Sequence, residues 1–195
     1  MHRISVCLTD YLIVNRIIAD DVREDHIYGF EVLLGKIINY TTLLFLAYIN
    51  GNFVQTLLFM MTFFPLRART GGYHCKKAFT CYLGTFVIYM VVTNVVTKLF
   101  IEHTGIMILT IFLSAVIIYF LAPINHPNLG LDKEEIKQCK SSARWLMWLI
   151  GICVLVLWWL NIIPDKIVYI VAGVGVDAGL LITAKILRQD RLSES

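Results

Sequence analysis

Residues 105–122 read GIMILTIFLSAVIIYFLA, an apolar run that contains no charged side chain. This length and composition predict a helix that crosses a membrane, because a spanning helix needs about 20 mostly apolar residues. Segments of similar character occur at 32–49, 53–66, 79–99, 145–163 and 167–187. The segment 53–66 is the shortest, since Pro65 and Arg67 close it. The pattern predicts an all-α, polytopic membrane bundle of about six transmembrane helices.

Composition supports the same class. The chain of 195 residues is 58% hydrophobic and only 16% charged, with a mean hydropathy of +0.72. Soluble domains are about 45–50% apolar and about 25% charged. We expect one integral-membrane domain over 1–195, with an N-terminal segment 1–30, a bundle 31–187 and a tail 188–195. A net charge of +3 gives no argument for a nucleic-acid partner.

The basic residues predict the orientation. Fifteen Lys and Arg residues lie near the chain start, after the second and fourth segments, and after the sixth. The connections on the opposite side of the membrane contain only two, Lys98 and Lys166. Because cytoplasmic loops of membrane proteins are enriched in Lys and Arg, this alternation predicts that both termini face the cytoplasm. The expected location is a bacterial cell membrane, with the chain crossing it several times.

The first residues have a different pattern. In residues 4–19, apolar side chains recur at helical spacing among polar ones. This favours an amphipathic helix in the membrane interface, although a helix packed under the bundle fits as well. Arg3, Asp10, Asn15 and Arg16 interrupt the apolar stretch, so we expect no signal peptide here.

The connection after the second segment has the composition of a reactive site. Residues 67–81 read RARTGGYHCKKAFTC. Gly71 and Gly72 allow a sharp turn, and Cys81 falls near the start of the next helix. The positive end of a helix and nearby lysines favour thiolate over thiol, which makes a cysteine nucleophilic. His74 is the nearby side chain suited to act as a base near neutral pH.

Spacing restricts how these two residues can meet. In one straight helix, residues seven positions apart have Cα atoms about 10.5 Å apart, beyond the reach of a nitrogen–sulfur contact. His74 must therefore lie on the turn, folded over the helix start. Other interpretations stay open. Cys75 is a competing candidate for the nucleophile, and Cys81 can instead be a small apolar residue that only fills space. A metal could also bind His74, Cys75, Cys81 and Cys139, although their spacing fits no usual zinc pattern. We expect no metal and no cofactor.

The pattern Arg67-x4-Gly72-x-His74-x6-Cys81 between the second and third membrane segments resembles the accessory gene regulator protein B (AgrB) family. Residues 123–127, which read PINHP and precede a Lys-rich loop, are also similar to that family. The resemblance implies a membrane cysteine endopeptidase that processes an AgrD-type propeptide into a cyclic autoinducing peptide for quorum sensing. It implies Cys81 as nucleophile and His74 as its partner. Arg67 and Gly72 match supporting positions of the motif.

Three further features have more than one explanation. Arg69 and Arg67 are candidates for stabilising an oxyanion, as are backbone N–H groups at the helix start. A loop over 133–144 contains Lys133, Lys137 and Lys140, which would bind an acidic part of the substrate or simply mark the cytoplasmic side.

Asp177 lies between Gly175 and Gly179 in the sixth segment, which suggests either function or close helix packing; we expect it to lie too deep, by about half a bilayer, to orient His74. A peptide exporter or a non-catalytic scaffold is the alternative function. A homodimer is permitted.

Overall fold

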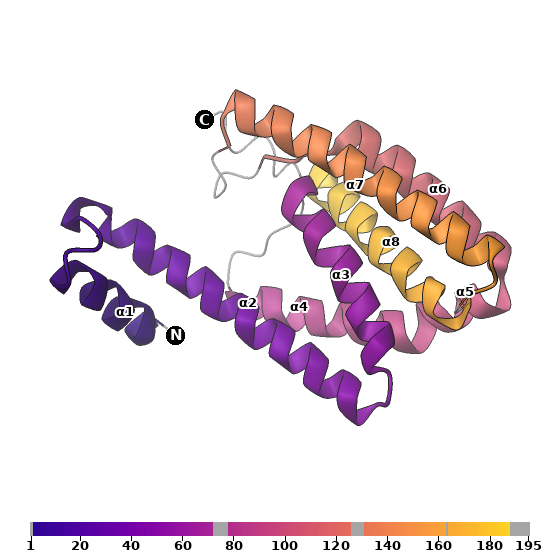
Figure 1. Cartoon of the computed structure of the whole chain (residues 1–195), viewed down its shortest axis with the longest axis horizontal. Helices are drawn as coiled ribbons and strands as arrows, with labels where there is room; N and C mark the ends of the chain where they lie inside the picture. The colour runs from indigo at the N-terminus through magenta and orange to yellow at the C-terminus, as the bar shows by residue number, and fades with distance from the viewer. Residues whose placement is uncertain (1, 72–77, 126–130, 163, 188–195) are drawn as a thin grey trace.

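The computed structural model describes residues 2–71, 78–125, 131–162 and 164–187, and these are almost wholly helical (Figure 1). No β-strand occurs within those ranges, which confirms the prediction of an all-α chain. The elements in chain order are α1 (His2–Val14), the 3-10 turn η1 (Asp20–Val22), α2 (Arg23–Ile49), α3 (Phe53–Thr70), α4 (Ala78–Val91), the π-helical turn η2 (Val92–Val96), α5 (Thr97–Glu102), α6 (Thr104–Leu121), α7 (Lys133–Trp159) and α8 (Pro164–Ile186).

Several of these helices have the character of membrane spans. Five stretches in the described part of the chain are long and apolar enough to cross a bilayer: Asp20–Ile49, Thr80–Glu102, Thr104–Leu121, Lys133–Trp159 and Asp165–Ile186. The segment expected at 53–66 does form a helix, α3, but this helix has Pro65 inside it and Arg67 and Arg69 in its last turn. The count of six spans and the orientation of the termini stay predictions.

Helix α8 is the central element of the bundle. It packs against α3, α6 and α7, and 61% of its most apolar window is buried. Gly173 explains the closeness of α3, because a Cβ atom at this glycine would lie 3.2 Å from the carbonyl oxygen of Phe59. Gly175 faces α6, where its Cβ would lie 3.0 Å from Thr110 Cγ2. Small side chains therefore let the α3 backbone and a side chain of α6 approach α8, as is common between membrane helices.

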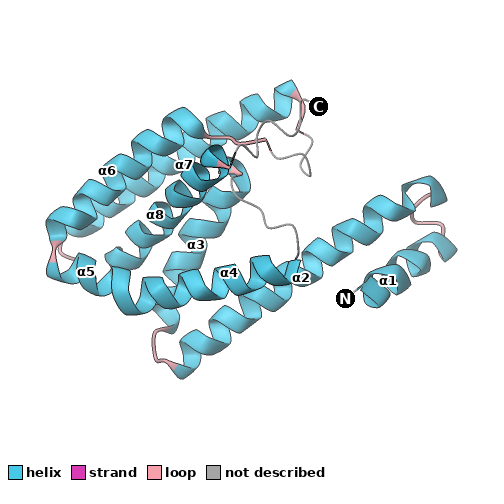
Figure 2. Cartoon of the chain, turned by 180° about the vertical axis from the view of Figure 1, so that it is seen from behind, coloured by secondary structure: helices cyan, strands magenta, loops and turns pink. Residues whose placement is uncertain are grey.

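The N-terminal helix lies apart from this bundle. Figures 1 and 2 show α1 folded back along the first half of α2, with the bundle at the other end of α2. Arg23 at the start of α2 forms a 2.9 Å ion pair with Asp10 of α1. The helix expected over 4–19 ends earlier, at Val14, because the chain turns at Arg16 with a φ of 57°. Its placement in the membrane interface stays a prediction.

The prediction of a loop over 133–144 is wrong, because these residues form the first turns of helix α7. Asp132 caps the helix by accepting a 2.7 Å hydrogen bond from the Glu135 backbone N–H, and the Glu135 carboxylate accepts a 2.9 Å bond from the Asp132 N–H. This reciprocal capping box satisfies two N–H groups that a helix start leaves open. A charged helix surface was mistaken for a charged loop. Helix α2 likewise begins at Arg23, ahead of the span expected at 32.

Candidate functional site

The end of α3 is fixed by a backbone contact with the segment after α6. Gly71 terminates the helix with a φ of 68° and a ψ of −133°, a conformation that side chains other than glycine avoid. A Cβ atom here would also overlap the carbonyl oxygen of Ile124. The Ile124 N–H donates a 2.9 Å hydrogen bond to the Thr70 carbonyl, and Gly71 and Ile124 form an isolated parallel bridge. The expected sharp turn is therefore confirmed at Gly71; Gly72 lies outside the described residues.

Asp177 meets this end of α3 from the middle of α8. Its side chain is fully buried, and its Oδ1 accepts a 3.0 Å hydrogen bond from the Thr70 hydroxyl. Its Oδ2 is buried without a hydrogen-bond partner in the described structure. A buried carboxylate is costly unless it is paired, so its neighbours determine whether it is tolerated.

Asp177 lies nearer to the end of α3 than a separation of half a bilayer implies, because it bonds Thr70, the last residue of that helix. Helix α8 continues nine residues beyond Asp177 to Ile186, a rise of about 13 Å. His74 lies outside the described residues, so the expectation that Asp177 does not orient it directly stays a prediction.

Arg67 connects these groups. Its guanidinium donates through Nη1 to the Gly71 carbonyl oxygen one turn later, which satisfies an acceptor at the helix end. The same guanidinium interacts electrostatically with Asp177 and with Cys81. Arg67 is only partly exposed, whereas Arg69 is exposed on another face of α3 and joins none of these contacts. Of the two arginines considered from the sequence, the structure brings Arg67 into the site.

Cys81 lies in the first turn of α4 and is half-buried. Its backbone carbonyl accepts a 3.0 Å hydrogen bond from the Thr85 hydroxyl, which is an ordinary helix contact. The positive end of α4 and the Arg67 guanidinium both favour a negative sulfur at this place. His74, the expected partner, and Cys75, the competing thiol, lie outside the described residues. The pairing of His74 with Cys81 therefore stays a prediction.

The segment after α6, which contains the PINHP stretch noted in the sequence, supplies a second anchor. The Asn125 side chain donates to the Leu131 carbonyl at 3.1 Å and accepts from the Leu131 N–H at 3.2 Å. It therefore ties together the two ends of the connection that contains His126 and Pro127, which lie outside the described residues. Since Ile124 holds Thr70, the end of α3 and the segment directly after α6 meet at one place. Ile124 acts through its backbone N–H, so its residue type gave little signal, and Thr70 contributes its carbonyl as well as its hydroxyl.

The remaining predicted residues lie on helix α7. Lys133, Lys137 and Lys140 lie on the first turns of α7, at helical spacing. Cys139 is a half-buried free thiol on the same helix. Within the described ranges no three His, Cys, Asp or Glu side chains gather as metal ligands, and two members of the metal set considered from the sequence, His74 and Cys75, are outside these ranges.

Comparison with known proteins places this arrangement in a family. A family model described as accessory gene regulator B matches residues 5–178. The chain belongs to the accessory gene regulator B family.

The match of the accessory gene regulator B model extends from α1 into α8 and includes Arg67, Cys81, Ile124 and Asp177. The accessory gene regulator protein B of Staphylococcus aureus strain Newman and that of strain USA300 / TCH1516 are each 28% identical over 129 residues, which is 61% of this chain and 66% of theirs. The protein of strain MRSA252 is 28% identical over 124 residues, 58% of this chain and 64% of its own. The chain therefore spans slightly less than two thirds of these relatives. No solved structure matches it.

Proposed function

We propose that this accessory gene regulator B protein is a membrane cysteine endopeptidase in quorum sensing, with Cys81 as nucleophile and His74 as its acid–base partner. One observation carries the proposal: Cys81 stands in the first turn of α4, within electrostatic range of the Arg67 guanidinium, which also interacts electrostatically with Asp177. A positive helix end and a nearby cation are the conditions that make a thiolate available near neutral pH. A cysteine that only fills apolar space would need neither the helix end nor the cation.

The reaction would proceed in two acyl transfers. His74 accepts the Cys81 thiol proton, and the thiolate attacks a peptide carbonyl of an AgrD-type propeptide. His74 then protonates the leaving amine, so the C-terminal tail departs and a thioester to Cys81 remains. A thiol or hydroxyl within the substrate attacks this thioester, its proton passes to His74, and Cys81 is released as the ring closes. Limited access of water favours ring closure over hydrolysis.

The supporting residues have separate roles in this proposal. Arg67 holds the end of α3 through the Gly71 carbonyl and favours the thiolate form of Cys81. Asp177 is a positioning residue, since it accepts the Thr70 hydroxyl, interacts electrostatically with Arg67 and lies on a different helix. Gly71 and Gly72 provide the turn that brings His74 over α4. Backbone N–H groups at the start of α4 would stabilise the oxyanion, with Arg69 as a further exposed cation.

The expected partners follow from the same proposal. The propeptide is the substrate, and its acidic part would contact Lys133, Lys137 and Lys140 on α7. The chain crosses the bacterial cell membrane several times, the site faces the cytoplasm, and a homodimer is compatible with the packing. We propose no nucleic-acid partner and no cofactor.

Replacement of the proposed nucleophile tests this function. Full-length protein is reconstituted in liposomes with a synthetic AgrD-type propeptide, and cleavage is followed by mass spectrometry. We expect Cys81→Ala to abolish cleavage and Cys153→Ala, an exposed thiol on α7, to retain it. His74→Ala should also block the reaction. Wild-type protein quenched in acid should contain a propeptide fragment bound to Cys81 as a thioester.

The outcomes separate the alternatives. Cleavage that survives Cys81→Ala and is lost in Cys75→Ala would move the nucleophile to the neighbouring thiol. Movement of intact propeptide across the liposome, with no cleavage and an ordinary, slow reaction of Cys81 with thiol probes, would instead favour an exporter. Binding without either event would favour a scaffold.

A further inference from the structure

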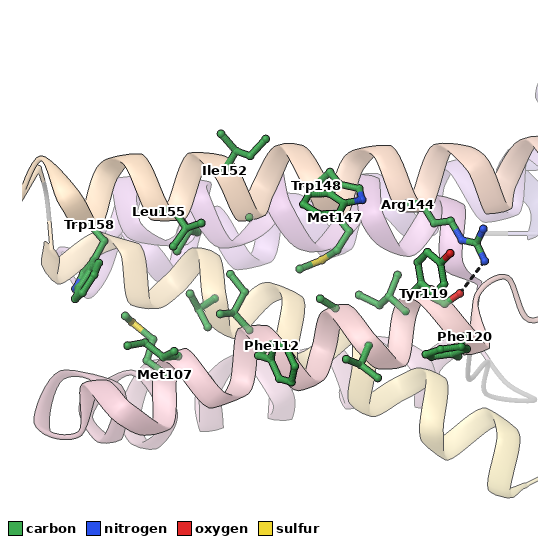
Figure 3. A pocket seen from close by; sticks show the side chains of 18 residues that line it. Met107, Phe112, Tyr119, Phe120, Arg144, Met147, Trp148, Ile152, Leu155 and Trp158 are labelled. Atoms are coloured by element: carbon green, nitrogen blue, oxygen red, sulfur yellow. Dashed lines mark hydrogen bonds between the residues drawn. The ribbon is translucent and has the colours of Figure 1, made fainter.

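A long apolar groove separates α6 from α7 on the outside of the bundle. Its volume is about 730 Å³, and its walls are nearly all aliphatic, aromatic or methionine side chains (Figure 3). It extends from Met107 in the first turns of α6 to Tyr119 near the end of that helix. Twelve residues of helix rise about 18 Å, close to the roughly 15 Å depth of one leaflet of a bilayer. The groove therefore has the length of one leaflet.

The groove is charged at one end only. Arg144 of α7 donates through Nη2 to the Tyr119 carbonyl at 3.1 Å, and its guanidinium carbon lies 3.9 Å from the centre of the Tyr119 ring (Figure 3). Its Nε is buried and has no hydrogen-bond partner in the described part of the chain. A second hollow of about 560 Å³ adjoins this end and is lined by Lys137, Lys140 and Trp145. Three cationic side chains, Arg144, Lys137 and Lys140, thus gather where the apolar walls stop.

We propose that this groove binds an anionic phospholipid, with an acyl chain along α6 and α7 and the headgroup phosphate at Arg144. The ligand must be apolar over the length of a leaflet and negative at one end, and a phospholipid with an anionic headgroup has this distribution. Arg144 is held in place by Tyr119, which leaves fewer rotamers to be lost on binding. Trp145 and Trp148 border the cationic end, the position of aromatic side chains at a membrane surface.

Two other occupants fit the groove less well. A second copy related by an axis normal to the membrane would bring its own Arg144 and Lys140 to the same depth, so like charges would face each other. A propeptide helix that is amphipathic would place its polar face against walls that offer almost no hydrogen-bonding group. Lipid binding here does not depend on the proposed peptidase reaction.

Native mass spectrometry of the full-length protein in detergent tests the proposal. The protein is titrated with phosphatidylglycerol or with phosphatidylcholine of the same acyl chains. We expect phosphatidylglycerol to bind about tenfold more tightly, the effect of one charge-assisted hydrogen bond, and Arg144→Gln to remove this preference. Inorganic phosphate should not displace the lipid, because it has no acyl chain.

Two variants distinguish the groove from a general surface effect. Gly151 lines the groove and has nothing within 4 Å of an added Cβ, so Gly151→Trp should fill the space and weaken binding of both lipids without a backbone clash. Lys36→Gln, an exposed cation on α2, should leave the preference unchanged. Equal affinity for the two lipids, or an equal loss in Lys36→Gln and Arg144→Gln, would overturn the proposal. Cross-linking of the propeptide or of a second copy to Phe112 in liposomes that contain phosphatidylglycerol would overturn it as well.

Discussion

Helices α6 and α8 are both strongly apolar, yet they have opposite environments. Helix α6 has a mean hydropathy of 2.4 over its most apolar stretch, and 17% of that stretch is buried. Helix α8 has a mean hydropathy of 2.0 over the corresponding stretch, and 61% of it is buried. The less hydrophobic helix therefore occupies the interior (Figure 1). It also contains the buried ionisable residue Asp177.

The difference between these helices follows from the solvent. Lipid tails are as apolar as leucine, so burial of an apolar helix in the bundle gains little transfer free energy. Helix α8 is interior because Gly173 and Gly175 allow close approach and because Asp177 binds Thr70. Small and polar side chains, rather than hydropathy, determine which helix is central here. Four sets of substitutions test this conclusion.

The largest effect is expected for Asp177→Leu. The change removes the acceptor of the buried Thr70 hydroxyl and a negative charge near Arg67. An unsatisfied buried hydroxyl, together with a cation that loses its nearby carboxylate, costs about 3–5 kcal/mol of unfolding free energy. Reversible unfolding in mixed SDS–phospholipid micelles measures this change in unfolding free energy. Asp177→Asn keeps an acceptor and should cost less; equal stability of the leucine variant and wild type would contradict the role of Asp177 in holding α3.

A matched pair of leucines compares the helices directly. Leu181 of α8 is fully buried, whereas Leu113 of α6 is 47% exposed. Leu181→Ala should leave a cavity and lower the unfolding free energy by about 3 kcal/mol. Leu113→Ala should change it by about 0.5 kcal/mol or less, because lipid fills the space. Equal losses in the same unfolding assay would mean that the outer face of α6 is covered by protein.

A pair of glycines tests close approach. Gly173→Leu places a side chain against the α3 backbone at Phe59 and Phe63, and this overpacking should cost about 2 kcal/mol. Gly151→Leu on α7 has open space around it and should be neutral or stabilising by up to about 1 kcal/mol through helix propensity. Thermal denaturation in detergent compares the two variants. If both are tolerated, α8 is central for another reason than its glycines.

The smallest effect is expected for Thr70→Val. This nearly isosteric change removes one hydrogen bond to Asp177 and keeps the packing volume. Hydrogen bonds between membrane helices contribute about 1 kcal/mol, so the unfolding free energy should fall by about that amount. In the propeptide assay, the variant should lose more activity than a variant of equal stability loss far from the site. A loss no larger than that of the stability-matched variant would make Thr70 purely structural.

Helix positions were largely predictable from sequence. The run 105–122 corresponds to α6 at Thr104–Leu121, and the run 167–187 to α8 at Pro164–Ile186. A long apolar run has few alternatives in lipid, since every backbone group must be satisfied within the helix. The turn at Gly71 was predictable for a similar local reason. The start of α7 was missed although Asp132 and Glu135 have the spacing of a capping box.

Contacts between distant segments were not predictable in the same way. The hydrogen bond between Thr70 and Asp177 joins residues 107 positions apart. Whether the two side chains meet depends on where α3 ends along the length of α8. Ile124 participates through its backbone, which any residue type would supply. Hydropathy sets which residues are helical and leaves open which helices meet. The catalytic pairing of His74 with Cys81 stays a prediction for the cleavage assay.

The bond between Thr70 and Asp177 also has a consequence for synthesis of the protein. A ribosome makes α3 and α4, with Arg67 and Cys81, long before it makes α8, since 107 residues separate the two bonded side chains. Until α8 is inserted, the Thr70 hydroxyl has no carboxylate beside it. The proposed nucleophile therefore reaches the membrane before its surroundings are complete. A chain released before α8 would contain every residue of the motif at 67–81 and would still lack an assembled site.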